Sequence, residues 1–314
     1  MDGDAMADIA PPPVSFTVNV CNADVPFLDK TLRHMLRALN FPFHERLLAY
    51  DPGRQEGKYA ERRQGDRVQM EGILDRLLGD GIIDRIDIVP WDEEEQQRIL
   101  KRYFGHASID LKDFSGAPIY QYLWALDRCS GDVVFHADSD MLFYSASPRS
   151  WIYDALELFE RENTVIMATP HGGPPQARNW VERFLNRSFE RTPRSLWHTA
   201  DSVSTRYFLM QRGRFEQALP LLQHKSGEPL ENSLTRTFRE RGLERWSMNG
   251  YTHWAIHPWK HDDNFIRHLD DLVWAVEHGV YPFRRTGYRW DMRTEGPYMR
   301  EWLAVLRAHG RGLS

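Results

Sequence analysis

The first half of the chain alternates short apolar runs with stretches whose apolar residues recur every three to four positions. Residues 14–20 form a β-branched run bounded by turn residues, which predicts a strand. A helix is predicted next, because four apolar residues recur at i, i+3, i+4 and i+7: Leu32, Met35, Leu36 and Leu39. A second strand is predicted over residues 46–50 and ends at Asp51-Pro52-Gly53, a strong turn signal.

The same alternation continues as far as the middle of the chain. The elements expected there are a polar loop over residues 54–67, a helix over 68–78, a strand over 83–89, a helix from about Pro118 to Cys129 and a strand over 132–137. Strands that alternate with helices favour a mostly parallel sheet covered on both faces. The chain is therefore predicted to belong to the α/β class.

The second half is less regular. Residues 171–175, His-Gly-Gly-Pro-Pro, are expected to lie outside regular structure. The predicted elements are a strand over 205–211, a helix over 214–223, a helix over 234–241 and a loosely alternating strand over 246–256. No internal repeat is evident, so we expect a loose leader over residues 1–13 and a single domain over 14–314.

Composition adds little to this picture but excludes several classes of protein. The chain has 314 residues, 41% of them hydrophobic and 27% charged, an ordinary globular balance. Its net charge of −5 argues against a nucleic-acid-binding protein, for which an excess of positive charge is typical. Cys21 and Cys129 are far apart and outside any CxxC pattern, which argues against a disulfide scaffold or a zinc ribbon. Without a signal-peptide pattern or a run of ~18 apolar residues, a cytoplasmic protein with no transmembrane segment is expected.

Two carboxylates one residue apart follow the strand predicted over residues 132–137. Asp138-Ser139-Asp140 stands where a buried strand gives way to a turn, and ligands of open α/β sheets collect at the carboxyl ends of strands. Such carboxylates hold Mg²⁺ or Mn²⁺ together with substrate phosphates. A cation at this place would stabilise the charge on a departing nucleoside diphosphate. The alternative is a pair of turn carboxylates without a ligand.

Around these residues the chain resembles the family 2 type of glycosyltransferase, which has the GT-A fold. The resemblance covers about residues 14–256 and rests on the order and spacing of five segments: Val18-Asn19-Val20-Cys21-Asn22, the helix with Thr31-Leu32 and Met35-Leu36, the helix ending at Ala125-Leu126, Ser130-Gly131-Asp132, and Asp138-Ser139-Asp140. The family often carries Pro-Thr-Tyr before that first Asn, where this chain has Val20-Cys21. The resemblance implies a mixed GT-A sheet with flanking helices, with a nucleotide-sugar-binding half over residues 14–145 and an acceptor-binding half over 146–314.

The resemblance also implies which residues bind the donor. Cys21 and Asn22 would lie near the nucleotide, and Asp51 would contact the uracil or the ribose. The motif itself, Asp138, Ser139 and Asp140, would hold the ribose and the diphosphate, and both aspartates would bind the metal. A structural role for Asp51 stays open, because an Asp before Pro-Gly also forms turns.

The catalytic base is expected further along the chain. The family places an acidic pair at a helix N-terminus, followed about eleven residues later by a Gly, and here Glu231 stands eleven residues before Gly242. Glu231 would accept the proton of the acceptor hydroxyl. Glu228 is the rival. For both, helix capping is the alternative, because acids are favoured at a helix start whatever their chemistry.

Histidines near the end of the resemblance are candidates for a third metal ligand. His253, His257 and His261 form a group, and His257 is preferred because Pro258-Trp259-Lys260 follows it, which is similar to the tail of retaining members. A hydrogen-bonded structural role is the alternative for each.

Aromatic and basic residues of the second half are weighed for the acceptor side. Trp197, Trp246 and Trp254 would stack on a sugar, or belong to the core as most large aromatic residues do. Residues 171–202, with Arg178, Arg191 and Arg194, would form a lid over the diphosphate or a solvated basic helix.

The resemblance implies a metal-dependent glycosyltransferase of the hexosyltransferase type, using Mn²⁺ or Mg²⁺. It would transfer a sugar from a nucleotide-sugar donor, expected to be a UDP-sugar, to an acceptor hydroxyl with inversion. The acceptor would be a glycan, a lipid-linked molecule or a small molecule. Two alternatives stay open: a sugar-nucleotide pyrophosphorylase, although Cys21-Asn22-Ala23-Asp24 lacks its Gly-rich basic loop, and a catalytically silent carbohydrate-binding protein of the same fold. No Gly-rich dinucleotide or P-loop motif and no Gly-x-Ser-x-Gly elbow is present.

Overall fold

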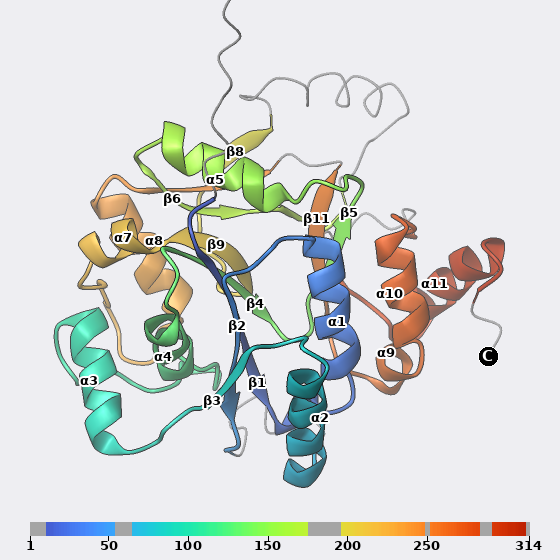
Figure 1. The fold of residues 1–314 in the computed structure, drawn as a ribbon, viewed down its shortest axis with the longest axis horizontal. Helices are drawn as coiled ribbons and strands as arrows, with labels where there is room; N and C mark the ends of the chain where they lie inside the picture. The colour runs from blue at the N-terminus through green and yellow to red at the C-terminus, as the bar shows by residue number, and fades with distance from the viewer. Residues whose placement is uncertain (1–10, 54–64, 175–195, 249–251, 283–290, 312–314) are drawn as a thin grey trace, which may run out of the picture.

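A mixed β-sheet forms the centre of the molecule. The computed structural model describes residues 11–53, 65–174, 196–248, 252–282 and 291–311, and within them eight strands follow the order β3-β2-β1-β4-β9-β6-β10-β8 (Figure 1). The strands are, in that order, Arg85–Ile88, Glu45–Asp51, Val14–Cys21, Val133–Asp138, Tyr207–Gln211, Val165–Thr169, Glu244–Met248 and Trp197–Ala200. β3, β2, β1 and β4 are parallel, whereas β9 is antiparallel to both its neighbours. The predicted α/β class and mixed sheet are confirmed.

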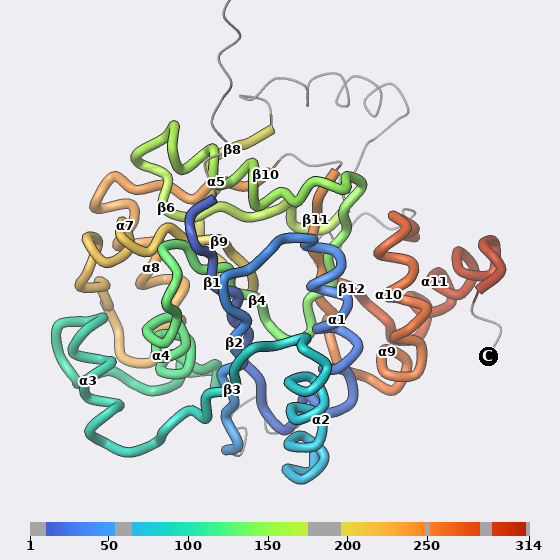
Figure 2. Tube along the Cα trace, viewed as in Figure 1, coloured from blue at the N-terminus to red at the C-terminus, as the bar shows by residue number. Residues whose placement is uncertain are grey.

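Helices cover both faces of this sheet, as the trace in Figure 2 also shows. One apolar core contains residues of α1 (Leu28–Leu39), α2 (Arg67–Gly79) and α5 (Trp151–Arg161). The other contains residues of α3 (Glu93–Phe104), α4 (Tyr120–Arg128), α7 (Arg212–Gln217) and α8 (Leu230–Glu240). The four apolar residues that predicted α1 are all in or against the first core, since their spacing places them on one helix face.

A smaller sheet extends the molecule beyond α1. Its strands are β5 (Leu142–Ser145), β11 (His253–Pro258) and β12 (Asp291–Met292), and β7 (His171–Gly172) also pairs with β11. A third apolar core lies between this sheet and the helices α9 (Asp263–Arg267), α10 (Leu269–Glu277) and α11 (Pro297–Ala308). Because β5 follows β4 after three residues, this unit reaches the end of β4. A short 3₁₀ turn, η1 (Asn22–Asp24), follows β1.

Several predicted boundaries were wrong. Instead of one strand over 246–256 there are two, β10 and β11, in different sheets. Residues 171–175 were expected to lack regular structure, but His171 and Gly172 form β7 by pairing with β11. The helix predicted over 214–223 covers only Arg212–Gln217, because Leu219-Pro220 follows and proline cannot continue a helix. Within the described residues, no helix is long and apolar enough to cross a membrane.

The motif Ser130-Gly131-Asp132 has a packing explanation. A Cβ on Gly131 would lie 2.7 Å from the carbonyl oxygen of Pro13 and 2.8 Å from the amide nitrogen of Ser15. The Gly131 amide donates a hydrogen bond to Ser15 Oγ (2.8 Å). Only glycine lets β4 begin this close to β1, which sets the register of the two strands.

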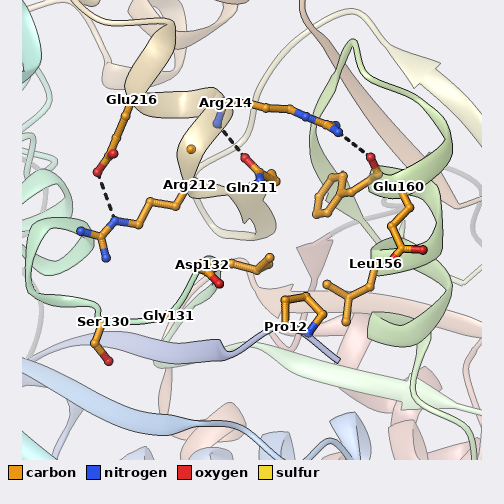
Figure 3. Close-up of a pocket in the computed structure, with 13 residues that line it drawn as sticks. Pro12, Ser130, Gly131, Asp132, Leu156, Glu160, Gln211, Arg212, Arg214 and Glu216 are labelled. Atoms are coloured by element: carbon orange, nitrogen blue, oxygen red, sulfur yellow. Dashed lines mark hydrogen bonds and ion pairs between the residues drawn. The ribbon is translucent and has the colours of Figure 1, made fainter. Parts of the chain in front are cut away.

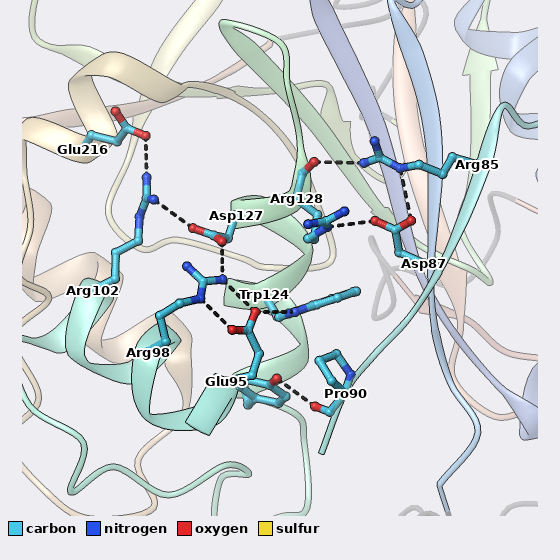
Figure 4. Close-up of polar contacts among 11 residues, drawn as sticks. Arg85, Asp87, Pro90, Glu95, Arg98, Arg102, Trp124, Asp127, Arg128 and Glu216 are labelled. Atoms are coloured by element: carbon cyan, nitrogen blue, oxygen red, sulfur yellow. Dashed lines mark hydrogen bonds and ion pairs between the residues drawn. The ribbon is translucent and has the colours of Figure 1, made fainter. Parts of the chain in front are cut away.

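Ion pairs fasten α3 to α4 at the surface (Figure 4). The carboxylate of Asp127 in α4 lies 2.6 Å from Arg98 Nη2 and 3.0 Å from Arg102 Nη1. Arg98 also forms an ion pair with Glu95. The indole of Trp124 donates to Glu95 Oε1 (3.2 Å). These contacts hold α4 against α3, and one end of α4 borders the carboxyl ends of the central strands.

A buried histidine connects α1 to the smaller sheet and its helices. His34 of α1 is fully buried, its Nε2 accepts the Phe143 amide (2.9 Å), and its Nδ1 lies 2.8 Å from Glu277 Oε1. Because Nε2 is an acceptor, the ring is neutral with its proton on Nδ1. Burial lowers the pKa of His34, while the hydrogen bonds from His34 and Arg37 lower the pKa of Glu277 to about 2.

This contact predicts a loss of stability in mild acid. The folded His34 binds protons less readily than the unfolded one, whose ordinary pKa is 6.5. The free energy of unfolding should therefore fall as the pH drops below 6.5, by at most about 1.4 kcal/mol per pH unit from this residue. Urea unfolding between pH 7.5 and 5 should show a shallower decline for His34→Gln than for the unmodified chain. Equal slopes would contradict the assignment.

Candidate functional site

The parallel strands β2, β1 and β4 end side by side. In their register Cys21 lies opposite Asp51, and Asn19 lies opposite Asp138. A cavity of about 110 Å³ opens at this edge, and the residues that line it are Asn19, Val20, Cys21, Asp24, Pro118, Gln121, Tyr122, Asp138, Ser139 and Asp140. The side-chain amide of Asn19 has no hydrogen-bond partner among the described residues, although its Nδ2 and Oδ1 are both buried. Four of the predicted donor residues therefore share one cavity.

The motif after β4 is held by backbone contacts from two directions. The Asp138 amide donates to the carbonyl of Arg206 (2.7 Å), and the Met141 amide donates to the carbonyl of Asp138 (3.2 Å). From α1, the hydroxyl of the buried Thr31 donates to the carbonyl of Ser139 (2.6 Å). These bonds close the turn in which both aspartates stand.

The two aspartates have different partners. Asp138 Oδ1 accepts a hydrogen bond from the hydroxyl of Tyr122, and His136 Nε2 lies 3.6 Å away. Asp140 Oδ2 lies 2.8 Å from His261 Nε2, and the His261 ring packs 4.5 Å from that of Phe27. Both carboxylates are thus partly buried and paired, as charges in this position require.

The end of β2 is joined to the end of β1. Asn22 donates to the carbonyl of Pro52 (3.1 Å) and accepts from the hydroxyl of Tyr50 (2.7 Å). Asp51 is 4% exposed, and its Oδ1 accepts from the Gly53 amide (2.8 Å) and from the indole of Trp91 (3.0 Å). Asp51 therefore forms the predicted turn, and it also stands at the same sheet edge as the motif.

Glu231 and Glu228 have contrasting surroundings. Glu231, in the first turn of α8, accepts the hydroxyl of Thr205 at 2.6 Å and remains partly exposed. Glu228 is 8% exposed and accepts from Arg236 (2.8 Å), Ser233 (3.0 Å) and the His224 amide (2.9 Å). The bonds from Arg236 are the largest cause that lowers the pKa of Glu228 to about 2. Glu228 is thus held by three donors, whereas Glu231 keeps a partly exposed carboxylate.

The histidine group divides in the structure. His257 Nε2 lies 2.5 Å from Asp291 Oδ1, which also faces Arg206 at 3.3 Å. His253 is buried, and desolvation lowers its pKa to about 4. Only His261 of the three contacts the motif. Because β11 ends at Pro258, the chain turns before His261 and brings it back to Asp140.

Most of the predicted acceptor residues lie elsewhere. Trp197 and Trp254 are buried in apolar cores, and Trp254 stacks on Tyr144 at 5.0 Å. Trp246 is in β10, partly buried against the first core. The three arginines of the expected lid, Arg178, Arg191 and Arg194, lie outside the described residues.

Sequence reasoning missed three residues that complete the site: Gln121, Tyr122 and Thr205. Gln121 donates to the carbonyl of Ala49 (3.1 Å) and so spans the strand ends. Tyr122 and Thr205 contact Asp138 and Glu231, respectively. In the sequence Gln121 and Tyr122 belong to a predicted helix and Thr205 starts a predicted strand, and nothing in their spacing points to the motif.

The donors present fit a divalent cation held together with a ligand. Among the described residues, no group of three or more His, Cys, Asp or Glu side chains forms a ready metal cage. The Asp140–His261 pair supplies one oxygen and one nitrogen donor, and Asp138 stands beside them. Mg²⁺ and Mn²⁺ are commonly held by few protein ligands, with phosphate oxygens completing the sphere.

A larger cavity of about 640 Å³ lies at the opposite edge of the sheet, where β4 begins (Figure 3). Its arginines are engaged in contacts with the protein: Arg212 pairs with Glu216 (3.2 Å), and Arg214 donates to the carbonyl of Glu162 at the end of α5 (2.9 Å). Ligands of α/β sheets collect at the carboxyl ends of strands, so this cavity is not the candidate site.

No family model and no curated protein matches the chain. Solved structures do match it. GalNAc-T7, solved with UDP, GalNAc and Mn²⁺, is 10% identical over 96% of this chain and 48% of its own, with a TM-score of 0.47. The mannosyltransferase PcManGT from Pyrobaculum calidifontis, solved with GDP-Man and Mn²⁺, is 12% identical over 96% of this chain and 78% of its own (TM-score 0.43). TarS from S. aureus is 12% identical over 83% and 39% (TM-score 0.41).

The chain thus spans about half of the length of GalNAc-T7 and less than half of that of TarS.

The structural role of Glu228 predicts a stability effect. Glu228→Gln removes the charge that Arg236 faces at a largely buried place, so it should lower the free energy of unfolding by about 2 kcal/mol. Denaturant unfolding at pH 7 measures this, and Glu240→Gln, at an exposed acid in the last turn of α8, is the control. The difference between the variants should shrink below pH 4.5, where the unfolded carboxyl becomes protonated. A Glu228→Gln variant as stable as the control would contradict the role.

Proposed function

We propose that the chain is a metal-dependent glycosyltransferase that moves a sugar from a nucleotide-sugar donor to an acceptor hydroxyl. The observation that supports this best is the placement of Asp138 and Asp140 in one cavity with the end of β1, next to which β2 ends at Asp51. A nucleotide lying across those strand ends would bring its diphosphate to the two aspartates. Residues 14–145 would then bind the donor, and residues 146–314 would form the acceptor side.

The donor base is proposed to contact the Asp51 side of the cavity. Asp51 is fixed by the Gly53 amide and the Trp91 indole, so its carboxylate is held in one orientation. A carboxylate accepts hydrogen bonds and therefore favours a base that offers a ring N–H, as uracil does. Asn22 and Cys21 would border the nucleotide from β1. Guanine offers a ring N–H as well, and of the two bases uracil is the one that the resemblance to family 2 glycosyltransferases implies, so we propose a UDP-sugar donor.

The cation is proposed to be Mn²⁺ or Mg²⁺, held by Asp140 and His261 with Asp138 alongside. His261 replaces His257 in this role, because His261 contacts Asp140 whereas His257 contacts Asp291. When bound, the cation would neutralise the charge of the leaving diphosphate. The two aspartates have different partners, which supports different roles for them. Asp140 would bind the cation, and Asp138 would bind the ribose or a phosphate.

Glu231 is proposed as the general base. It would take the proton of the acceptor hydroxyl while that oxygen attacks the anomeric carbon in line, so that the sugar is transferred with inversion. Thr205 donates to Oε1 and so orients the carboxylate. The acceptor, a glycan, a lipid-linked molecule or a small molecule, would approach from the α8 side.

The cation-binding role predicts a loss of turnover when both carboxylates are neutralised. The joint Asp138→Asn and Asp140→Asn variant should lower turnover of the best donor by about 10³-fold, because several kcal/mol of charge stabilisation is removed. A panel of UDP- and GDP-sugars with Mn²⁺ measures donor turnover. Asp132→Asn, at the exposed start of the same strand, is the control. If the joint variant kept the turnover of the unmodified chain and needed no cation, the proposal would be overturned. If the unmodified chain bound the donor without turnover, a silent binding protein would be favoured. Turnover that needs a sugar phosphate and a nucleoside triphosphate would favour a pyrophosphorylase.

The base predicts a separable effect. Glu231→Gln should lower kcat for transfer by about 10²- to 10⁴-fold, the range of general base catalysis, and leave nucleotide binding unchanged. Steady-state kinetics and calorimetric titration with UDP and Mn²⁺ measure the two quantities. A parallel loss of both would indicate a donor-binding role for Glu231 and contradict its assignment as base.

A further inference from the structure

Tyr122 is the side chain that touches the first aspartate of the motif from outside β4. It lies near the start of α4, lines the same cavity, and its hydroxyl donates a hydrogen bond to Asp138 Oδ1. The phenol is neutral, so it acts here as the donor and the carboxylate as the acceptor. A neutral donor stabilises the charged carboxylate.

His136 approaches the same oxygen from within β4. Its ring is buried between Tyr122 (4.8 Å) and Phe208 (5.2 Å), and its Nε2 lies 3.6 Å from Asp138 Oδ1. That nitrogen has no hydrogen-bond partner among the described residues. Both neighbours of Asp138 thus face Oδ1, while 30% of the Asp138 side chain stays exposed.

We propose that Tyr122 is a positioning residue that holds Asp138 by Oδ1 and so presents Oδ2 to the donor. This inference rests on the proposed function. A carboxylate held in one rotamer loses no orientation entropy on binding, which is why supporting hydrogen bonds strengthen ligand binding without touching the ligand.

The test is Tyr122→Phe, which keeps the ring against His136 and removes only the hydroxyl. For the unmodified chain, we expect UDP to bind measurably with Mn²⁺. In the variant, the Mn²⁺ concentration for half-maximal UDP binding should rise about tenfold, as for the loss of one hydrogen bond to a charged group. For the best donor, KM should rise by a similar factor while kcat changes less. Tyr103→Phe, a buried phenol of α3 away from the cavity, is the control and should leave both constants unchanged.

A double-mutant cycle separates positioning from simple packing. Asp138→Asn should weaken UDP binding less in the Tyr122→Phe background than in the unmodified chain, because each change removes the charge-assisted bond between Tyr122 and Asp138. Additive effects, or a Tyr122→Phe variant with unchanged Mn²⁺ half-saturation, would overturn the positioning role and leave the proposed function standing. If the unmodified chain bound no nucleoside diphosphate with Mn²⁺, the proposed function and this inference would fall together.

Discussion

Three parallel strands that end together place their polar ends at one edge of the sheet, and the rest of the site depends on this constraint. β2, β1 and β4 are in register, so Asp51, Cys21 and Asp138 cannot move apart without breaking the central ladder. Gly131 permits the close start of β4 against β1 and thereby fixes where β4 ends. The apolar cores on both faces hold the strands in this order. The position of the carboxylates follows from the sheet.

Carboxylates gathered at such an edge need partners, and the surrounding elements supply them. α4 brings Tyr122 to Asp138, and the segment after β11 brings His261 to Asp140. Thr205 reaches Glu231, and its neighbour Arg206 binds the backbone of the motif. Each carboxylate thus has its own set of donors. Distinct surroundings are what allow neighbouring acids to serve different purposes.

The sequence predicted the central part of this arrangement well, because β1, β2, β4 and α1 have strong periodic patterns bounded by turn residues. The Asp138–Asp140 motif was recognisable for the same reason, since it directly follows an apolar run. The helices α3, α5, α10 and α11 were not predicted, although Asp92 and Ser150 cap α3 and α5 through side-chain hydrogen bonds to their first turns. Cap residues are weak signals in a sequence, because Asp and Ser are also common in turns.

Residues whose role depends on tertiary contact were harder to predict. The choice between His257 and His261 depends on how the chain turns after Pro258, and the choice between Glu228 and Glu231 depends on Arg236. Tyr122 becomes important only because α4 packs against β1 and β2 and so brings this side chain to the end of β4, which no local pattern encodes. His261 and Asp140, for example, are more than a hundred residues apart in the sequence.

The edge formed by β2, β1 and β4 is proposed to bind a divalent cation together with a nucleoside diphosphate. Electron paramagnetic resonance of Mn²⁺ tests it directly, because the sharp signal of the free ion is lost on binding. With the chain in excess, adding UDP should remove most of the free-ion signal beyond what UDP alone removes, and the joint Asp138→Asn and Asp140→Asn variant should abolish that difference. A signal that depends only on UDP, with or without the chain, would contradict the account.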